Sequence, residues 1–172
     1  DISVAEDGLL YTIDYDNSRV IVFNEKGRYI RTWGSYGLGE GQFIRPTAIA
    51  VKFGKVYVGE HNRIQIFDLD GKYIGKFGGN EEYLGSVALN VATSGIAISN
   101  NGIVYVANHS GKSIVYFNAV GEYLGEWPFN HFPDAIAVAP NGNVYVIYSG
   151  GVRYYEADGT YIGWWGRGGT GD

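Results

Sequence analysis

The stretch Gly27-Arg28-Tyr29-Ile30-Arg31-Thr32-Trp33 decides how this chain folds, because its pattern returns three more times. The shared pattern is Gly-x-Tyr-Ile/Leu-x-x-aromatic, and the later copies occupy residues 71–77, 121–127 and 159–165. A strand-like run that contains a tyrosine precedes each copy. Self-similarity at about 40 to 50 residues is typical of a propeller or a solenoid, in which each unit buries its faces against its neighbours.

The composition agrees with a turn-rich β domain. The 172 residues are 45% hydrophobic, which is enough for one domain with a substantial core. Charged residues make up only 18% and there are 27 glycines, a balance typical of all-β folds. The net charge of −5 argues against nucleic acid as a partner, and the sequence has no apolar run long enough for a membrane span. Because the sequence has no cysteine, disulfides, thiol nucleophiles and thiolate metal sites are excluded.

Each repeat reads as four short strands, a to d, with d formed by the quoted pattern. Strand a is expected at 2–4, 48–51, 95–98 and 135–138, strand b at 9–12, 56–58, 103–106 and 144–146, and strand c at 20–23, 64–67, 114–117 and 152–155. Asn-Gly pairs at 101–102 and 141–142 are strong hairpin signals between strands a and b. We therefore expect an all-β fold, a β-propeller of four-stranded antiparallel blades, with blades at residues 1–43, 44–86, 87–132 and 133–172.

The aromatic residues have two possible roles. Four positions per repeat take 16 of the 27 Trp, Tyr and Phe residues. These rings could form a sugar-binding platform, but their equivalent strand positions favour packing between blades. A few aromatic residues outside the pattern are free for another role, namely Tyr15, Tyr36, Tyr83, Phe129 and Tyr148.

The repeat resembles the NHL repeat. The matching segments are Pro133-Asp134-Ala135-Ile136-Ala137-Val138, Asn62-Arg63-Ile64-Gln65-Ile66-Phe67 and the link Gly39-Glu40-Gly41-Gln42-Phe43. NHL repeats usually build six-bladed propellers, so the resemblance implies about two more units and a segment of a longer chain. The outer blade faces would then need cover from missing blades, from another chain or from closure into a four-bladed ring.

The b–c and d–a connections of a propeller emerge on one face, which is the default binding surface. The candidate binding residues on these connections are Tyr15, Asp16, His61, Tyr83, His109, His131 and Tyr148. Two acid–arginine pairs, Asp14 with Arg19 and Glu60 with Arg63, are expected to fix loop shape rather than to bind a ligand.

Metal binding and catalysis find no support in the motifs. The three histidines stand on different connections and lack a His-x-His or Glu-x-x-His spacing, so no metal site, cofactor or catalytic residue is expected. The G-x-G-x-x-G match at 166–171 has no helix after it to receive a phosphate. Asn108-His109-Ser110 is a glycosylation acceptor pattern on a loop that should be exposed, which favours an extracytoplasmic location.

Three functions remain to be weighed. The NHL resemblance implies a non-enzymatic binding or scaffold module that contacts a protein or peptide, as similar propellers do in ubiquitin ligases and in bacterial sensor kinases. The alternative is a metal-dependent propeller enzyme, a lyase or lactonase-like hydrolase with a site on the axis. RNA binding ranks last, because acidic residues outnumber basic ones on the loop face.

Overall fold

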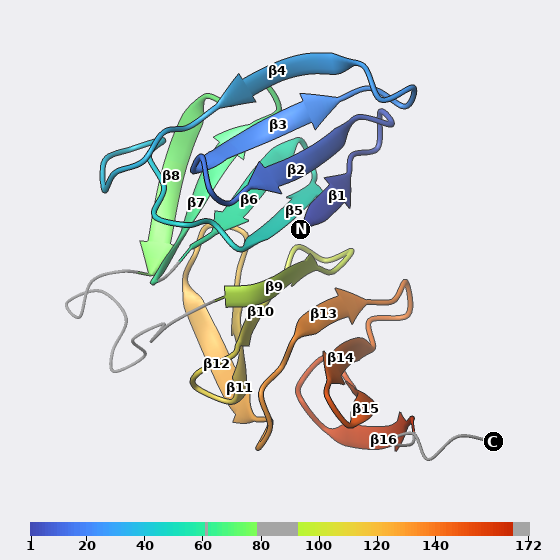
Figure 1. The fold of residues 1–172 in the computed structure, drawn as a ribbon. Helices are drawn as coiled ribbons and strands as arrows, with labels where there is room; N and C mark the ends of the chain where they lie inside the picture. The colour runs from blue at the N-terminus through green and yellow to red at the C-terminus, as the bar shows by residue number, and fades with distance from the viewer. Residues whose placement is uncertain (61, 79–92, 167–172) are drawn as a thin grey trace. The chain divides into compact units, whose positions relative to one another are not determined.

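A computed structural model of the chain describes residues 1–60, 62–78 and 93–166. The regular structure in these residues is β, arranged in four antiparallel sheets of four strands (Figure 1). We call the sheets blades 1 to 4 in chain order. In each blade, the four strands lie side by side in sequence order, as the a to d pattern predicts. The described residues contain no helix that is long and apolar enough to cross a membrane.

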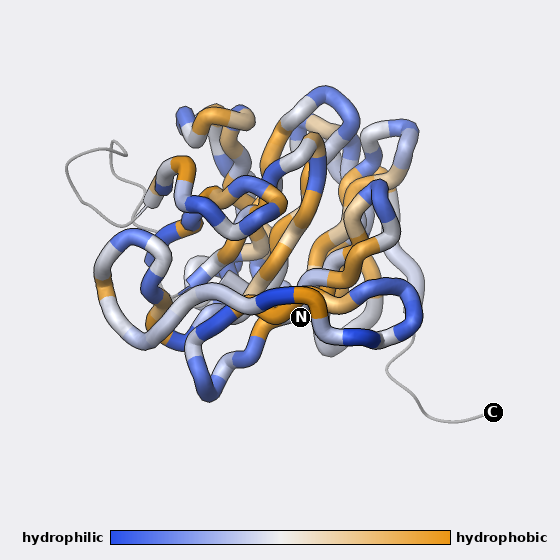
Figure 2. The backbone as a smooth tube through the Cα atoms, turned by 90° about the horizontal axis from the view of Figure 1, so that it is seen from above, coloured by the Kyte–Doolittle hydropathy of each residue, from blue (hydrophilic) through white to orange (hydrophobic). Residues whose placement is uncertain are grey.

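The strand bounds agree with the predicted strands to within a few residues. Blade 1 contains β1 (Ile2–Val4), β2 (Leu10–Asp14), β3 (Arg19–Phe23) and β4 (Tyr29–Trp33), and blade 2 contains β5 (Ala48–Lys52), β6 (Lys55–Gly59), β7 (Arg63–Asp68) and β8 (Tyr73–Gly78). Blade 3 contains β9 (Thr93–Ile98), β10 (Val104–Asn108), β11 (Ser113–Phe117) and β12 (Tyr123–Pro128), and blade 4 contains β13 (Ala135–Val138), β14 (Val144–Tyr148), β15 (Gly151–Tyr155) and β16 (Tyr161–Trp165). Apolar residues lie along the strands and polar residues at the turns (Figure 2).

The pairing of strands c and d has the same irregularity in every blade. The register shifts by one residue at Val22/Phe23, Ile66/Phe67, Tyr116/Phe117 and Tyr154/Tyr155. A shift of this kind is a β-bulge, which increases the local twist of the sheet. Because the bulge falls just before the c–d turn each time, the structural repeat matches the sequence repeat.

The chain divides into two compact units, Asp1–Thr93 and Ser94–Asp172. In the first unit, blades 1 and 2 share a core that includes Tyr11, Val20, Val22, Phe43 and Phe67. In the second unit, a corresponding core between blades 3 and 4 includes Tyr105, Ile114, Trp127, Phe129 and Tyr155. Burial of these apolar faces against each other is the main stabilising term within each unit.

One joint between neighbouring blades occurs in both units. In the first unit, the ring of Trp33 lies against the glycine of the next c–d turn, where a Cβ on Gly71 would come within 2.5 Å of the indole. The hydroxyl of Tyr11 donates a 3.1 Å hydrogen bond to the carbonyl of Leu69 in the same turn. In the second unit, a Cβ on Gly159 would come within 2.6 Å of the Trp127 indole, and the hydroxyl of Tyr105 donates to the carbonyl of Ala157 at 2.9 Å.

The prediction that the repeated aromatic residues pack between blades is confirmed for the strand b tyrosines and the tryptophans of these two joints. It is wrong for the tyrosine that opens strand d. Three of the tyrosines that open strand d are solvent-exposed, namely Tyr29, Tyr123 and Tyr161. Each of them begins an outermost strand, so it has a neighbouring strand on one side only. Its ring therefore contacts only residues at the edge of the sheet. The ring centre of Tyr161, for example, lies 5.7 Å from that of Tyr155.

Candidate functional site

The antiparallel order of the strands places the b–c turns and the d–a links at one end of each blade. Of the predicted binding residues, His61 and Tyr83 lie outside the described residues. In the first unit, Tyr15 and Asp16 are exposed on the b–c turn of blade 1, and the guanidinium of Arg45 lies 5.9 Å from the centre of the Tyr15 ring. In the second unit lie His109, His131 and Tyr148.

Two of these predicted residues meet in the second unit around an arginine. His131, on the d–a link between blades 3 and 4, stacks on Tyr148 at the end of β14 with ring centres 4.6 Å apart. The Arg153 guanidinium lies over the rings of Tyr148 and Phe129, at 5.2 and 5.6 Å from their centres. We call Phe129, His131, Tyr148 and Arg153 the Arg153 cluster.

Hydrogen bonds hold the Arg153 cluster in place. Nη1 of Arg153 donates to the carbonyl of Phe129 at 3.2 Å, and Nη2 lies 2.8 Å from Nε2 of His131. A guanidinium can only donate, so Nε2 of His131 is the acceptor and the ring proton is on Nδ1. Burial lowers the pKa of Arg153, but hydrogen bonds with the hydroxyls of Tyr155 and Tyr148 raise it on balance above its ordinary value. Arg153 is therefore a permanent cation at this end of the blade.

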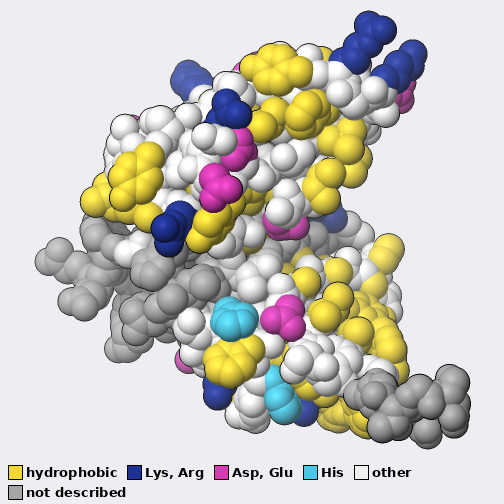
Figure 3. Space-filling model, in the orientation of Figure 1, with side chains coloured by type: hydrophobic (Ala, Val, Ile, Leu, Met, Phe, Trp, Pro, Cys, Tyr) yellow, Lys and Arg dark blue, Asp and Glu magenta, His cyan; other side chains and the backbone are white. Residues whose placement is uncertain are grey.

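A second pair of contacts continues along the same link. The rings of His109 and Phe132 stack 4.9 Å apart, and the ammonium of Lys112 lies 4.5 Å from the centre of the Phe132 ring. Nε2 of His109 is 3.9 Å from Oδ1 of Asp134. Figure 3 shows the two described histidines on one face, each beside hydrophobic side chains. Phe132 is half exposed, so an apolar ring with the Lys112 cation beside it is open to a partner.

The local sequence explains why the link comes so close to the turn. The backbone N–H groups of Phe129 and Asn130 both donate to the carbonyl of Lys112 on the b–c turn of blade 3, at 2.8 and 3.3 Å. Lys112 and Asn130 adopt positive φ angles of 50° and 64°, which let the two segments bend toward each other. In blade 4, Gly151 has a φ of +133° and passes so near the Trp165 carbonyl that a Cβ would come within 2.5 Å.

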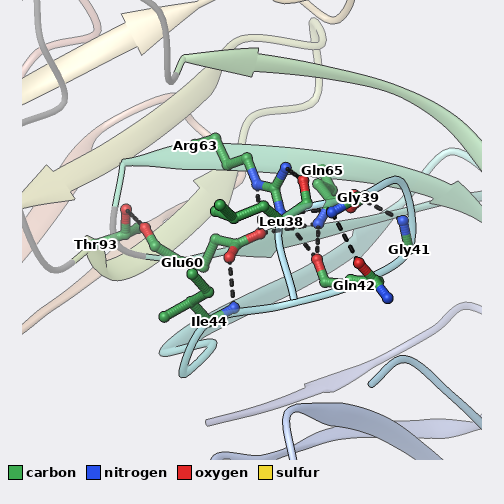
Figure 4. A network of polar contacts seen from close by, with 9 residues as sticks. All are labelled: Leu38, Gly39, Gly41, Gln42, Ile44, Glu60, Arg63, Gln65 and Thr93. Carbon is green, nitrogen blue, oxygen red and sulfur yellow. Dashed lines mark hydrogen bonds and ion pairs between the residues drawn. The ribbon is translucent and has the colours of Figure 1, made fainter. Parts of the chain in front are cut away.

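Blade 2 uses the same region in a different way (Figure 4). Arg63 and Glu60 form a buried ion pair of 2.7 Å, which confirms the predicted pairing. Glu60 also accepts a 2.7 Å hydrogen bond from the N–H of Ile44 and a 2.8 Å bond from the amide of Gln65. Arg63 in turn donates to the carbonyls of Leu38 and Gln42. This network satisfies its own charges and ties the d–a link 38–44 to the blade.

Strand register shows what blade 4 has in place of that network. Gln65 pairs with Val58 in blade 2, and Arg153 pairs with Val146 at the equivalent position of blade 4. The positions of Glu60 and Arg63 correspond to Tyr148 and Gly151, so the ion pair has been lost and blade 4 has a cation at the Gln65 position instead. Within the described residues, no carboxylate forms an ion pair with Arg153.

Sequence reasoning missed Arg153, Lys112 and Phe132. The available signal was the departure of blade 4 from Asn-x-Arg, since 148–151 read Tyr-Ser-Gly-Gly. The expectation of an exposed glycosylation loop is wrong at its acceptor: the side chain of Asn108 is buried. It accepts from the N–H of Gly111 at 3.1 Å and lies 3.4 Å from the hydroxyl of Ser113, because it closes the b–c turn in place of an acid–arginine pair.

A metal centre and a pocket are two other kinds of candidate site. Among the described residues, no group of three or more His, Asp or Glu side chains gathers to hold a metal ion. A hollow of about 450 Å³ lies at the opposite end of blade 1, where it is lined by turn residues, namely Asp7, Gly8, Leu9, Asn24, Glu25, Lys26 and Arg28. This hollow is far along the strands from the predicted loop face and contains none of its residues.

Comparison with known proteins supports the fold. Residues 2–76 match the family model described as a 6-bladed beta-propeller, and no curated protein matches the chain. Hydrazine synthase of Kuenenia stuttgartiensis is similar over 95% of this chain and 47% of its own, with 15% identity and a TM-score of 0.74. Virginiamycin B lyase from Staphylococcus aureus is similar over 96% of this chain and 54% of its own, with 15% identity and a TM-score of 0.71.

A chain of a nidogen/laminin complex is similar over 94% of this chain and 62% of its own, with 14% identity and a TM-score of 0.71. The chain is thus an all-β protein with the blades of a β-propeller, and it spans about half the length of the first solved structures that it resembles. At such low identity, the likeness defines the fold alone. The similar proteins include both a lyase and a chain from a protein complex, so the fold is compatible with either class of function.

Proposed function

We propose that this chain is a non-enzymatic binding module that contacts a protein or peptide through the b–c and d–a loops, and that blades 3 and 4 supply the central contacts. The observation that carries the proposal is the Arg153 cluster, where a guanidinium without a carboxylate partner among the described residues lies over two aromatic rings. Arginine and tyrosine are enriched among the residues that dominate protein interfaces.

The chemistry of the cluster favours a ligand with a carboxylate. The Arg153 guanidinium already has four partners, namely the Phe129 carbonyl, His131 and the hydroxyls of Tyr155 and Tyr148. A guanidinium has five N–H donors and pairs well with carboxylates, so Arg153 can still donate to an acidic ligand. The exposed ring of Phe132 and the nearby Lys112 ammonium extend the surface with one apolar and one cationic contact. An acidic peptide with an apolar residue beside the acid therefore fits best.

The NHL resemblance supports the same class of function. Its Gly-x-Gly-Gln-Phe link and its acid–arginine pair form the network of Figure 4, which stiffens the loop face without using an exposed charge. We propose that residues 1–172 act as one such module, with the four repeats as its blades. Rigid blades that carry variable loops are suited to binding, because the scaffold limits the entropy lost when a partner docks.

A displayed library of random peptides, selected on the purified chain, tests this function. We expect enriched peptides to contain Asp or Glu next to an apolar residue. Replacement Arg153→Gln should weaken binding of the selected peptides about tenfold or more, since a charged contact near an interface centre is lost. The matched control is Lys26→Gln, which removes a cation at the opposite end of blade 1 and should leave binding unchanged.

Two results would contradict the proposal. One is a selection that enriches no peptide, and the other is an Arg153→Gln variant that binds the selected peptides as tightly as the parent chain. Metal analysis of the purified protein adds an independent check. Zinc or calcium at one equivalent per chain would instead favour the metal-dependent lyase or lactonase-like hydrolase.

A further inference from the structure

One contact of the Arg153 cluster depends on the protonation state of a histidine. Nε2 of His131 accepts a hydrogen bond from Nη2 of Arg153 at 2.8 Å, and the His131 side chain is exposed to solvent. Histidine is the side chain that takes up a proton between about pH 8 and pH 5. Because Arg153 is a permanent cation that can only donate, this hydrogen bond exists only while His131 is neutral.

The other contacts of Arg153 are unchanged in mild acid. Nη1 donates to the backbone carbonyl of Phe129 at 3.2 Å, and the guanidinium lies over the rings of Phe129 and Tyr148. A backbone carbonyl does not titrate in this range, and the hydroxyls of Tyr148 and Tyr155 keep their protons, since phenols ionise only near about pH 10. Protonation of His131 therefore releases Nη2 and leaves the guanidinium in place.

Aromatic contacts keep the His131 ring beside Arg153 in acid as well. The ring stacks on Tyr148 with centres 4.6 Å apart and an angle of 27° between the planes. It also meets the Phe129 ring at 6.0 Å in an edge-to-face arrangement. A cation over the face of an aromatic ring is attracted to it, so protonation strengthens the contact with Tyr148. In acid, two cationic donors therefore lie side by side at the surface.

The charged groups around His131 do not balance this pair of cations. On the same link, the carboxylate of Asp134 lies 3.9 Å from Nε2 of His109. The ammonium of Lys112, on the b–c turn of blade 3, adds positive charge beside the link. Arg153 has no ion pair with any carboxylate in the part of the chain that the structure describes. Two adjacent cations repel each other, and a bound anion removes this repulsion.

We propose that His131 makes binding at the Arg153 cluster depend on pH, so that an acidic ligand binds more tightly in mild acid than at neutral pH. At neutral pH, His131 occupies one donor of Arg153. In mild acid, the freed Nη2 and the protonated Nε2 offer two N–H donors to one carboxylate, and charge-assisted hydrogen bonds of this kind are strong. Protonation of His131 and binding of the carboxylate then favour each other by the same factor. This inference rests on the proposed binding function, whereas the loss of the hydrogen bond in acid is a property of the free chain.

Proton–nitrogen NMR of the free chain tests the contact without any ligand. At about pH 7.5, we expect the His131 ring to carry its proton on Nδ1 and none on Nε2, and in acid we expect protons on both nitrogens. The guanidinium signals of Arg153 should shift as His131 titrates, and this shift should be absent in His131→Gln. A proton on Nε2 at neutral pH, or Arg153 signals that do not follow His131, would overturn the proposal.

The affinity for the selected acidic peptides tests the link between protonation and binding. We expect the affinity of the parent chain to rise about fivefold or more between about pH 7.5 and about pH 5.5. The peptide carboxylates stay largely ionised in this range, so their own titration does not cause the rise. The His131→Gln variant keeps an acceptor for Arg153 that does not titrate, so its affinity should be the same at both pH values. A parent affinity that is constant or that falls in acid would contradict the proposal.

The matched control is His109→Gln. It removes the other described histidine of this surface but leaves the contact between Arg153 and His131, so the rise in affinity should remain. His61 lies outside the described residues and is present in both variants, so it contributes equally to both. A rise that persists in His131→Gln, or that both variants lose equally, overturns the proposal. A selection that enriches no peptide contradicts the binding function and this inference together, whereas peptides whose affinity ignores pH contradict this inference alone.

Discussion

The carboxylate of Glu60 shows how one buried side chain can organise a loop. It contacts Arg63, Gln65 and the N–H of Ile44, and it is almost completely buried. Replacement Glu60→Ala would leave the Arg63 guanidinium buried without a counter-charge. We expect a loss of about 3–5 kcal/mol in the free energy of unfolding. Chemical denaturation measures this loss.

The control for this variant is Asp14→Ala, which removes the acid of the equivalent pair in blade 1. Asp14 bonds Arg19 at 2.9 Å, but the pair is partly exposed, so its loss should be much smaller than that of Glu60→Ala. Equal losses in the two variants would show that burial does not set the strength of these pairs.

The same Asp14 carboxylate gives a pH dependence of known sign. Hydrogen bonds from Asn17, and then from Arg19, lower the pKa of Asp14 below its ordinary value of 3.8. A lowered pKa in the folded state adds stability above the unfolded pKa, and this stability is lost as the pH falls through the folded pKa. We therefore expect the stability difference between the parent and Asp14→Asn to be present at neutral pH and to vanish in acid below the folded-state pKa of Asp14. Denaturation at several pH values measures it, and a difference independent of pH would contradict this prediction.

At the residue scale, sequence reasoning succeeded for local pairs and failed for pairs closed by a distant segment. Asp14 with Arg19 and Glu60 with Arg63 are three to five residues apart, so the turn alone brings them together. The partners of Arg153 depend on a link that lies 22 residues away at His131. No spacing in the sequence predicts that contact.

At the scale of the element, the c–d turns of blades 2 and 4 are the parts that contact the tryptophan of the preceding blade. A glycine there gives both a positive φ and room for the tryptophan of the adjacent blade. Gly159 and Gly142 separate these two effects, because their φ angles are +91° and +92°, yet only Gly159 has a ring at its Cβ position.

We expect Gly142→Ala to cost about 1 kcal/mol through the positive φ alone. Gly159→Ala should cost about 1–3 kcal/mol more, since the methyl group would push Trp127 out of its packed position. Thermal or chemical unfolding compares the two variants. A similar loss in both would mean that Trp127 moves aside without cost and that the joint is loosely packed.

The four strands of each blade followed from the sequence, whereas the recurring bulge did not. Alternating apolar residues and Asn-Gly turns define where strands begin and end. The bulge depends on how strand d pairs with strand c near residues such as Phe23 and Tyr29, and this pairing is a property of two strands together.

At the scale of the whole molecule, the proposed binding function has a thermodynamic consequence. A ligand that binds the folded chain and not the unfolded chain raises the midpoint of thermal unfolding. We expect the selected acidic peptides to raise the midpoint of the parent chain and of Lys26→Gln. Arg153→Gln should show a much smaller rise at the same peptide concentration, and a parent chain whose midpoint does not respond to the peptides would argue against binding.

The sequence alone determined the four-stranded repeat, because a period of this length records that every unit must bury equivalent faces. It also identified the rings that fill those faces and the two local ion pairs. Only the tertiary structure decided which rings are covered and which remain open, because covering depends on the neighbouring blade. For the same reason, the sequence could not indicate the Arg153 cluster, because the cluster forms where the link after blade 3 contacts Arg153 of blade 4.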